Sequence, residues 1–133
     1  MTREIKFRGL SKVQGRKYMT EMVYGQLDLK PRNDARIVWY GQVSTGRSVR
    51  RSVFVDFRTI GQLTGLSDSH DVALYEGDIC WNPHDETWGE IIWDEGGWCY
   101  QWDSIIENLH DCCHLVEVRG NIHENPELLE GKS

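Results

Sequence analysis

The chain has 133 residues, which is enough for one compact domain that buries its own core without metals or disulfides. Its net charge of −6 conceals an uneven distribution: residues 1–60 hold 13 Lys and Arg against 5 Asp and Glu, a net +8, whereas residues 61–133 hold 2 against 16, a net −14. We therefore expect a single domain, 1–133, with a basic N-terminal half, 1–60, and an acidic C-terminal half, 61–133.

Membrane and secretory signals are missing from the sequence. No run of about 20 apolar residues could cross a bilayer, and the segment Met1–Glu4 has no apolar stretch typical of a signal peptide. Four cysteines without a secretory signal favour a reducing compartment. We expect a soluble cytoplasmic protein that does not bind a membrane.

Short strands dominate the predicted elements of the basic half. Residues 5–8 alternate apolar and basic side chains, the pattern of a half-buried strand. A polar loop is expected at Ser11–Lys17, and Lys30–Asp34 contains Pro31 and an Asn-Asp pair that favour a turn. The segments Ile37–Val43 and Val49–Phe57 are rich in β-formers and flank a glycine-containing turn, so they predict a hairpin.

In the acidic half, extended segments are expected at Thr59–Leu66 and Tyr75–Trp81. The glycines of Asp94–Gly97 allow the positive φ of a tight turn, which predicts a hairpin between Trp88–Trp93 and Trp98–Trp102. We expect the tryptophans of this hairpin to be packed in the sheet, and Trp93→Ala to cost about 3–5 kcal/mol if that ring is buried.

Two short helices complete the prediction. Ser104 and Glu107 have the spacing of a capping box, which places a helix start at Ser104. After a strand at Leu115–Ile122, Asn125-Pro126 supplies a cap and a first-turn proline for a final helical turn. Many short strands with glycine turns indicate an all-β fold, a mostly antiparallel, barrel-like folded sheet with one or two short helices.

Three blocks of the sequence carry a family resemblance: Arg3–Arg8, Gly61–Leu66 continuing to Tyr75–Ile79, and Gly120–Leu129. Their order and spacing resemble the YopX proteins of bacteriophages and prophages. The resemblance implies folded antiparallel sheet with little helix, and it carries no established activity. Where the family has Asn-Gly before Tyr-Glu-Gly-Asp, this chain has His70-Asp71, so we do not expect a two-residue hairpin there.

The tract His110–His114 is the most metal-like segment, because its histidines are four apart and enclose two cysteines. However, there is no Cys-x-x-Cys, and adjacent cysteines on one element point in different directions, so a four-ligand site would also need Cys80 or Cys99. We expect structural cysteines, partly exposed histidines, and neither a metal nor a cofactor.

An acidic run offers oxygen ligands for Mg²⁺ or Ca²⁺, as phosphoryl-transfer sites require. It consists of Asp68, Asp71, Glu76, Asp78, Asp85 and Glu86. Its spacing fits no EF-hand, and the carboxylates of Glu76 and Asp78 are expected to accept backbone N–H groups at a bend. A metal-dependent phosphate-ester hydrolase at Glu76 and Asp78 is kept as an alternative function.

The basic half offers the best candidate surface. Arg47, Arg50 and Arg51 are close in sequence to Trp39 and Tyr40 and to Phe54 and Phe57. Single-stranded nucleic acid is bound by such combinations, because bases stack on aromatic rings and phosphates pair with cations. The alternative is that Trp39 and Phe57 belong to the core and the arginines line a solvated strand edge.

Recognisable nucleophile, phosphate-loop and zinc-protease motifs are missing, so no catalytic residue is assigned. The leading hypothesis is a non-enzymatic accessory protein of a phage or prophage that binds a host or phage macromolecule through its charged surfaces. The alternatives are the hydrolase above and a self-assembling structural protein whose basic and acidic halves dock between subunits.

Overall fold

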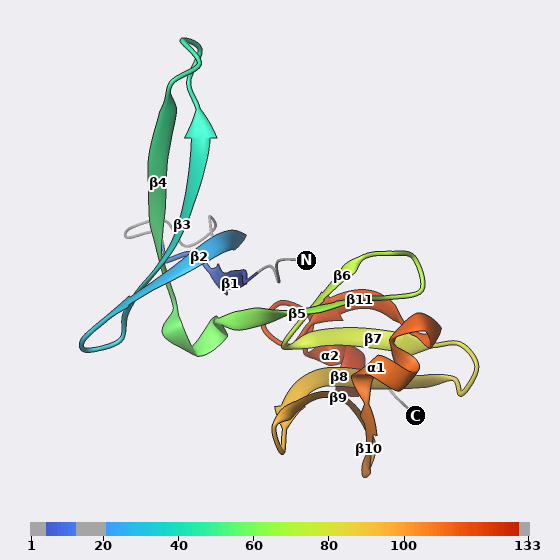
Figure 1. The fold of residues 1–133 in the computed structure, drawn as a ribbon. Coiled ribbons are helices and arrows are strands. Elements are labelled where there is room, and N and C mark those ends of the chain that lie inside the picture. Colours follow the sequence, from blue (N-terminus) through green and yellow to red (C-terminus); the bar gives the residue numbers. More distant parts are fainter. Residues whose placement is uncertain (1–4, 13–20, 131–133) are drawn as a thin grey trace. The chain divides into compact units, whose positions relative to one another are not determined.

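The computed structural model describes residues 5–12 and 21–130, and it confirms an all-β fold built from antiparallel strands (Figure 1). The chain divides into two compact units, Met1–Gln62 and Leu63–Ser133, here called the first and second units. Residues 61 and 62 are uncharged, so the first unit carries the whole net +8 and the second the net −14. The expectation that both act as one domain stays a prediction.

The first unit is an antiparallel sheet in the order β4-β3-β2-β1-β5. Its strands are β1 (Phe7–Leu10), β2 (Met22–Lys30), β3 (Asp34–Gln42) and β4 (Ser48–Val55). A single 3₁₀ turn, η1 (Phe57–Thr59), leads into β5 (Gly61–Ser67), which pairs with β1 through Gly61 and Gln62. The hairpin expected at 37–57 is confirmed, whereas the expected loop Ser11–Lys17 lies mostly outside the described residues.

One face of this sheet forms the core of the first unit. Ala35, Ile37 and Val55 are its buried centre, and Gly25 permits the close approach of β2 to β3, because a Cβ there would collide with the Val38 carbonyl oxygen. The register shows that β2 pairs with β3 only as far as Val38. Among the described residues, the end of β3 beyond Val38 therefore pairs with β4 alone and extends as a two-stranded arm (Figure 1).

The second unit contains a five-stranded antiparallel sheet in the order β10-β9-β8-β7-β11. The later residues of β5 pair instead with the short strand β6. The elements of the second unit after β5 are β6 (Ala73–Tyr75), β7 (Asp78–Asn82), β8 (Thr87–Asp94), β9 (Gly97–Trp102), β10 (Ile105–Asn108), α1 (Leu109–Cys112), η2 (Cys113–Leu115), β11 (Glu117–Asn121) and α2 (Glu127–Glu130).

Tyr100 lies at the centre of the second core, fully buried among Leu74, Ile91 and Leu109. Its hydroxyl donates a hydrogen bond to the Cys80 carbonyl at 3.1 Å, and burial raises the pKa of the phenol. Gly89 leaves the space that the ring occupies, since a Cβ there would overlap it. A tyrosine thus lies at the centre of this core, and Trp98 and Trp102 pack against the buried cluster.

The expectation for Trp93 is wrong. Its side chain is 53% exposed, although it makes an edge-on contact with Trp98 at 4.8 Å between ring centroids. The two rings are direct partners across the β8–β9 hairpin, and only Trp98 and Trp102 pack against the buried cluster. Trp93 lies next to the turn, and the core does not extend that far. Positive φ is found at Gly96, as expected of a glycine, and at Glu95, but not at Gly97.

The expected helix start at Ser104 is also wrong. Residues Ile105–Asn108 form β10, paired with β9, and the helix α1 begins only at Leu109. Asn108 is its cap, because its side-chain oxygen accepts from the His110 N–H at 2.9 Å. Pairing with β9 outweighs the local capping signal. The helical turn after Pro126 is confirmed as α2.

The barrel-like closure is not observed, although the antiparallel β class is. In the described residues both sheets are open, and the five-stranded sheet has β10 and β11 as its edges. The reason is that the strands are divided between two sheets, and each edge strand of the second sheet is only four or five residues long. None of the helices in the described ranges is long and apolar enough to cross a membrane.

A buried carboxylate organises the loop between β5 and β6, where no two-residue hairpin forms. Asp68 accepts from the N–H groups of His70 at 2.8 Å, Val72 at 2.9 Å and Val118 at 2.9 Å. Burial alone would raise the pKa of Asp68, but the three N–H groups together hold it below its usual value. Asp71 adopts φ 65° in this loop, the positive φ that glycine supplies elsewhere.

Candidate binding surface

Four of the five residues predicted for the binding surface lie on the two-stranded arm as direct cross-strand partners. Trp39 on β3 faces Arg51 on β4, and Tyr40 faces Arg50. Because partners share a face of a sheet and successive residues alternate between faces, these two pairs point in opposite directions. The structure therefore divides the predicted patch into two.

The outer face, opposite the core, carries Tyr40 and Arg50. Tyr40 is 63% exposed. Four residues closer to the core, the same face carries a second pair in the reverse order, Arg36 on β3 and Phe54 on β4. Strand geometry separates the two pairs by about 13 Å. We call these four residues, Arg36, Tyr40, Arg50 and Phe54, the aromatic face.

Phe54 is 51% exposed, and the guanidinium carbon of Arg36 lies 4.4 Å from the centre of its ring. This is a cation–π contact, in which the positive charge is attracted to the face of the ring. The carboxylate of Asp34 also holds Arg36, at 3.4 Å. The pair thus combines an exposed aromatic ring with a positive charge held over one face of that ring.

Arg50 is partly neutralised within the protein. Its guanidinium lies 3.6 Å from the carboxylate of Asp28 on β2, and both side chains are partly exposed. An ion pair between such exposed groups is worth at most about 1 kcal/mol. A phosphate can therefore compete with Asp28 for Arg50.

The other pair has a different environment. Trp39 is half-buried against the Ile37 cluster, so it belongs partly to the core as the alternative interpretation supposed. Arg51 is exposed on that same side of the arm and lies along Gly41. Arg47 is in the exposed turn at the end of the arm, where its carbonyl accepts from the Val43 N–H at 3.0 Å.

Sequence reasoning missed Arg36 as part of the surface and gave Phe54 only a secondary place. The signal was present in the spacing: Arg36 and Tyr40 are separated by an even number of residues within one strand, as are Arg50 and Phe54. Such residues share a face of a strand. Grouping basic and aromatic residues by proximity in the sequence, rather than by strand parity, placed Trp39 and Arg51 with them.

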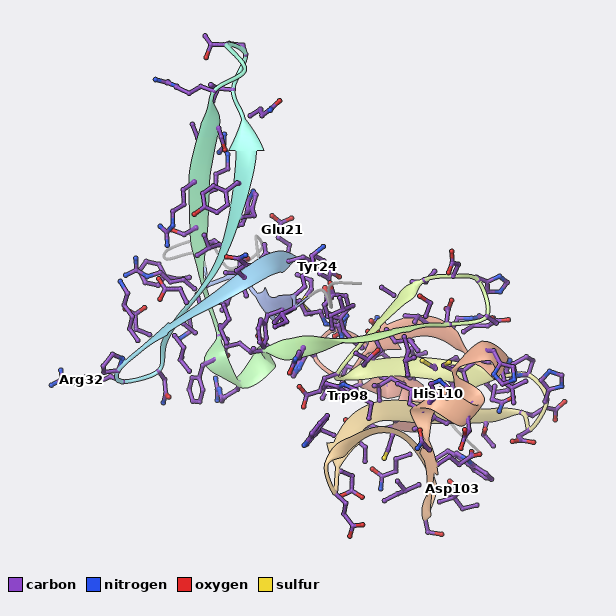
Figure 2. The ribbon with its side chains drawn as sticks, viewed as in Figure 1. Glu21, Tyr24, Arg32, Trp98, Asp103 and His110 are labelled. Carbon is purple, nitrogen blue, oxygen red and sulfur yellow. The ribbon has the colours of Figure 1, made fainter. Side chains whose placement is uncertain are left out.

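The His110–His114 tract contains a cysteine that is packed in the protein interior. The Cys112 thiol is buried and donates to the Asn108 carbonyl at 3.5 Å, and burial raises its pKa to about 12. The side chain of His110, labelled on α1 in Figure 2, is 81% exposed. Within residues 5–12 and 21–130, no three His, Cys, Asp or Glu side chains come together as metal ligands.

The acidic run does not gather into a metal site in the described part of the chain, and its two buried members, Asp68 and Asp78, hold backbone turns. Asp78 is 2% exposed, and its carboxylate accepts from the Tyr75 N–H at 2.7 Å, as expected for a bend. Asp68 is committed to the three N–H groups described above. Glu90 is half-buried, and its burial together with the charge of Glu76 raises its pKa. The Asp68 and Asp78 carboxylates thus stabilise backbone turns, and Glu90 lies on strand β8.

Comparison with known proteins agrees with the family that the sequence blocks resemble. The sequence model of the YopX protein family matches residues 6–130. The crystal structure of protein EF1440 from Enterococcus faecalis is similar, with a TM-score of 0.65 and 25% sequence identity over 96% of this chain and 99% of that one. A comparison with curated proteins gives no match.

Proposed function

We propose that this chain, which belongs to the YopX family, is a non-enzymatic binding module whose basic first unit binds single-stranded nucleic acid. One observation carries the proposal: two arginine–aromatic pairs lie on the same outer face of the β3–β4 hairpin, and both of their rings are exposed. Exposed rings on an antiparallel sheet give bases a stacking surface, and neighbouring arginines neutralise phosphates. The net charge of +8 in this unit supports electrostatic retention of the strand.

The biological setting is part of the proposal. We place the protein among phage or prophage accessory proteins acting in the cytoplasm of a bacterial host, where single-stranded nucleic acid of host or phage origin is the macromolecular partner. The sequence resemblance to phage and prophage proteins supports this setting.

The arm provides a matched pair of variants for a test. Arg50 and Arg51 are adjacent, both exposed, and on opposite faces. Binding of the full chain to a labelled single-stranded oligonucleotide is measured by fluorescence anisotropy across a salt series. Arg50→Ala should weaken binding and flatten the slope of log K against log salt by about 0.7, whereas Arg51→Ala should leave the slope nearly unchanged.

The aromatic residues test the stacking contribution. Tyr40→Ala and Phe54→Ala should each cost about 1–3 kcal/mol of binding free energy, while Phe57→Ala, an exposed phenylalanine of η1 outside the aromatic face, serves as the control. No binding by the unmodified chain at low salt rejects the proposal. Equal losses from Arg50→Ala and Arg51→Ala reduce it to a non-specific effect of net charge.

Self-assembly remains a second candidate, because the division of charge coincides with the division into units. A first unit with net +8 and a second with net −14 can attract each other between copies of the chain. Light scattering across a salt series distinguishes the two: oligomers that dissociate as salt rises favour assembly, and a monomer at all salt concentrations rejects it. The hydrolase alternative gains no such support, since Asp78 is buried and already hydrogen-bonded.

A further inference from the structure

A small pocket adjoins the aromatic face at the base of the β3–β4 hairpin, within the first unit. Its volume is about 250 Å³. The residues that line it are Lys12, Asn33, Asp34, Ala35, Phe54 and Val55. Phe54 belongs both to this pocket and to the aromatic face. The pocket is therefore next to the surface on which we propose that the nucleic-acid strand binds.

Backbone pairing builds the pocket. The Lys12 N–H donates to the Phe54 carbonyl at 2.7 Å, and Ser11 forms a bridge with Val55, so the end of the β1 segment runs beside the end of β4. On the opposite side, the β2–β3 turn holds Arg32 and Asn33 at φ 66° and 59°. Arg32, labelled at the end of this turn in Figure 2, extends outward, and Asn33 lines the pocket.

The lining combines three kinds of group. Ala35, Phe54 and Val55 are apolar, and Phe54 supplies an aromatic ring. Asn33 offers an amide that both donates and accepts, and Asp34 offers a carboxylate that only accepts. Lys12 contributes an exposed ammonium group. The ring suits stacking, the amide and the carboxylate suit recognition of the edge of a base, and the cation suits pairing with a phosphate.

We propose that this pocket receives one base of the bound single strand and prefers a base that carries an amino group. The inference rests on the proposed function and adds a specificity to it. The volume is slightly below that of usual small-molecule sites, which suits a single base. The Asp34 carboxylate holds Arg36 at 3.4 Å and keeps further lone pairs for a base. Because it can only accept hydrogen bonds, it pairs with the amino group of cytosine and repels the carbonyl oxygen that thymine has at that position.

The experiment compares oligo-dC and oligo-dT of equal length, two pyrimidine strands that differ at this edge. The full chain should bind oligo-dC more tightly than oligo-dT, by about fivefold. Asp34→Asn should remove most of that ratio, because an amide donates as well as accepts. Asp56→Asn is the matched control, because it removes the same negative charge. Asp56 pairs with Arg58 as Asp34 pairs with Arg36, but Asp56 lies outside the pocket lining.

Thermal melting followed by circular dichroism verifies that both variants remain folded. A ratio lost in Asp34→Asn and kept in Asp56→Asn supports the inference. Equal affinity of the unmodified chain for both strands, or a ratio that survives Asp34→Asn, overturns it and leaves binding by the aromatic face intact. Failure of the unmodified chain to bind either strand at low salt removes the proposed function as well.

Discussion

Arg50 on β4 reaches across β3 to Asp28 on β2, with 3.6 Å between guanidinium nitrogen and carboxylate oxygen. Arg50 faces Tyr40 in the register, and Asp28 faces Arg36. The ion pair therefore runs diagonally over the outer face, between the two arginine–aromatic pairs. If single-stranded nucleic acid binds here as proposed, the Asp28 carboxylate competes with its phosphates for Arg50.

Asp28→Asn should strengthen binding to single-stranded oligonucleotides by about twofold to fivefold, the equivalent of an exposed ion pair. The gain should require Arg50. A double-mutant cycle measured by anisotropy separates the two contributions, since Asp28→Asn in an Arg50→Ala background should give a smaller increase. An equal gain in both backgrounds would mean that only net charge changed.

Asp68→Asn should destabilise the protein by about 1–3 kcal/mol at pH 7, because an amide cannot accept from all three N–H groups. The folded pKa of Asp68 lies below its unfolded value, so folding favours the ionised form. This contribution is complete above the unfolded pKa, near 4, and is lost as pH falls through the lower folded pKa.

Urea unfolding at several pH values measures this effect. The difference between the unmodified chain and Asp68→Asn should narrow below pH of about 4. Asp71→Asn, which removes an exposed acid in the same loop, is the control for lost charge and should change the free energy of unfolding at pH 7 much less than Asp68→Asn does. A difference that stays constant from neutral to acidic pH would contradict the role assigned to the Asp68 carboxylate.

Tyr100 and Trp93 should respond very differently to truncation. Tyr100→Ala removes a fully buried ring and should cost about 3–5 kcal/mol. Trp93→Ala removes an exposed ring whose main described contact is the pairing with Trp98, and should cost no more than about 1.5 kcal/mol. Denaturant midpoints at unchanged m-value provide the comparison, and a larger loss for Trp93 would show that its surroundings are packed.

Chelation should leave stability unchanged. A cysteine binds zinc as the thiolate, and burial raises the pKa of the Cys112 thiol to about 12, so forming the thiolate there is unfavourable. Protein purified without chelator should contain no stoichiometric zinc, and EDTA should not shift its melting temperature. One zinc per chain, or a clear destabilisation by EDTA, would overturn the structural role assigned to Cys112 and its neighbours.

Short-range signals in the sequence predicted the turns well. Gly96 and Pro126 each act through the backbone of one or two residues, and the β8–β9 turn and α2 are found where these residues predict them. Local signals gave wrong predictions where pairing with another strand favours a different structure. The Ser104 capping box is a local preference, and the pairing of β10 with β9 outweighs it.

The candidate surface was predicted in part for a related reason. Composition identified the correct hairpin, but which side chains share a face depends on strand parity and on which face is buried against Ile37 and Val55. The pocket depends on Lys12 lying beside Phe54, a pairing of residues 42 positions apart. Nothing in the local sequence of either residue indicates that contact.

The end of the arm has a dynamic consequence. Beyond Val38, β3 has one described partner strand, and a two-stranded ribbon is at best marginally stable alone. Its backbone hydrogen bonds should open without unfolding of the Ile37 core, so amide hydrogens near Tyr40 should exchange much faster than those near Ile37. A ligand bound there would slow this exchange, which makes amide protection a direct report of occupancy, residue by residue.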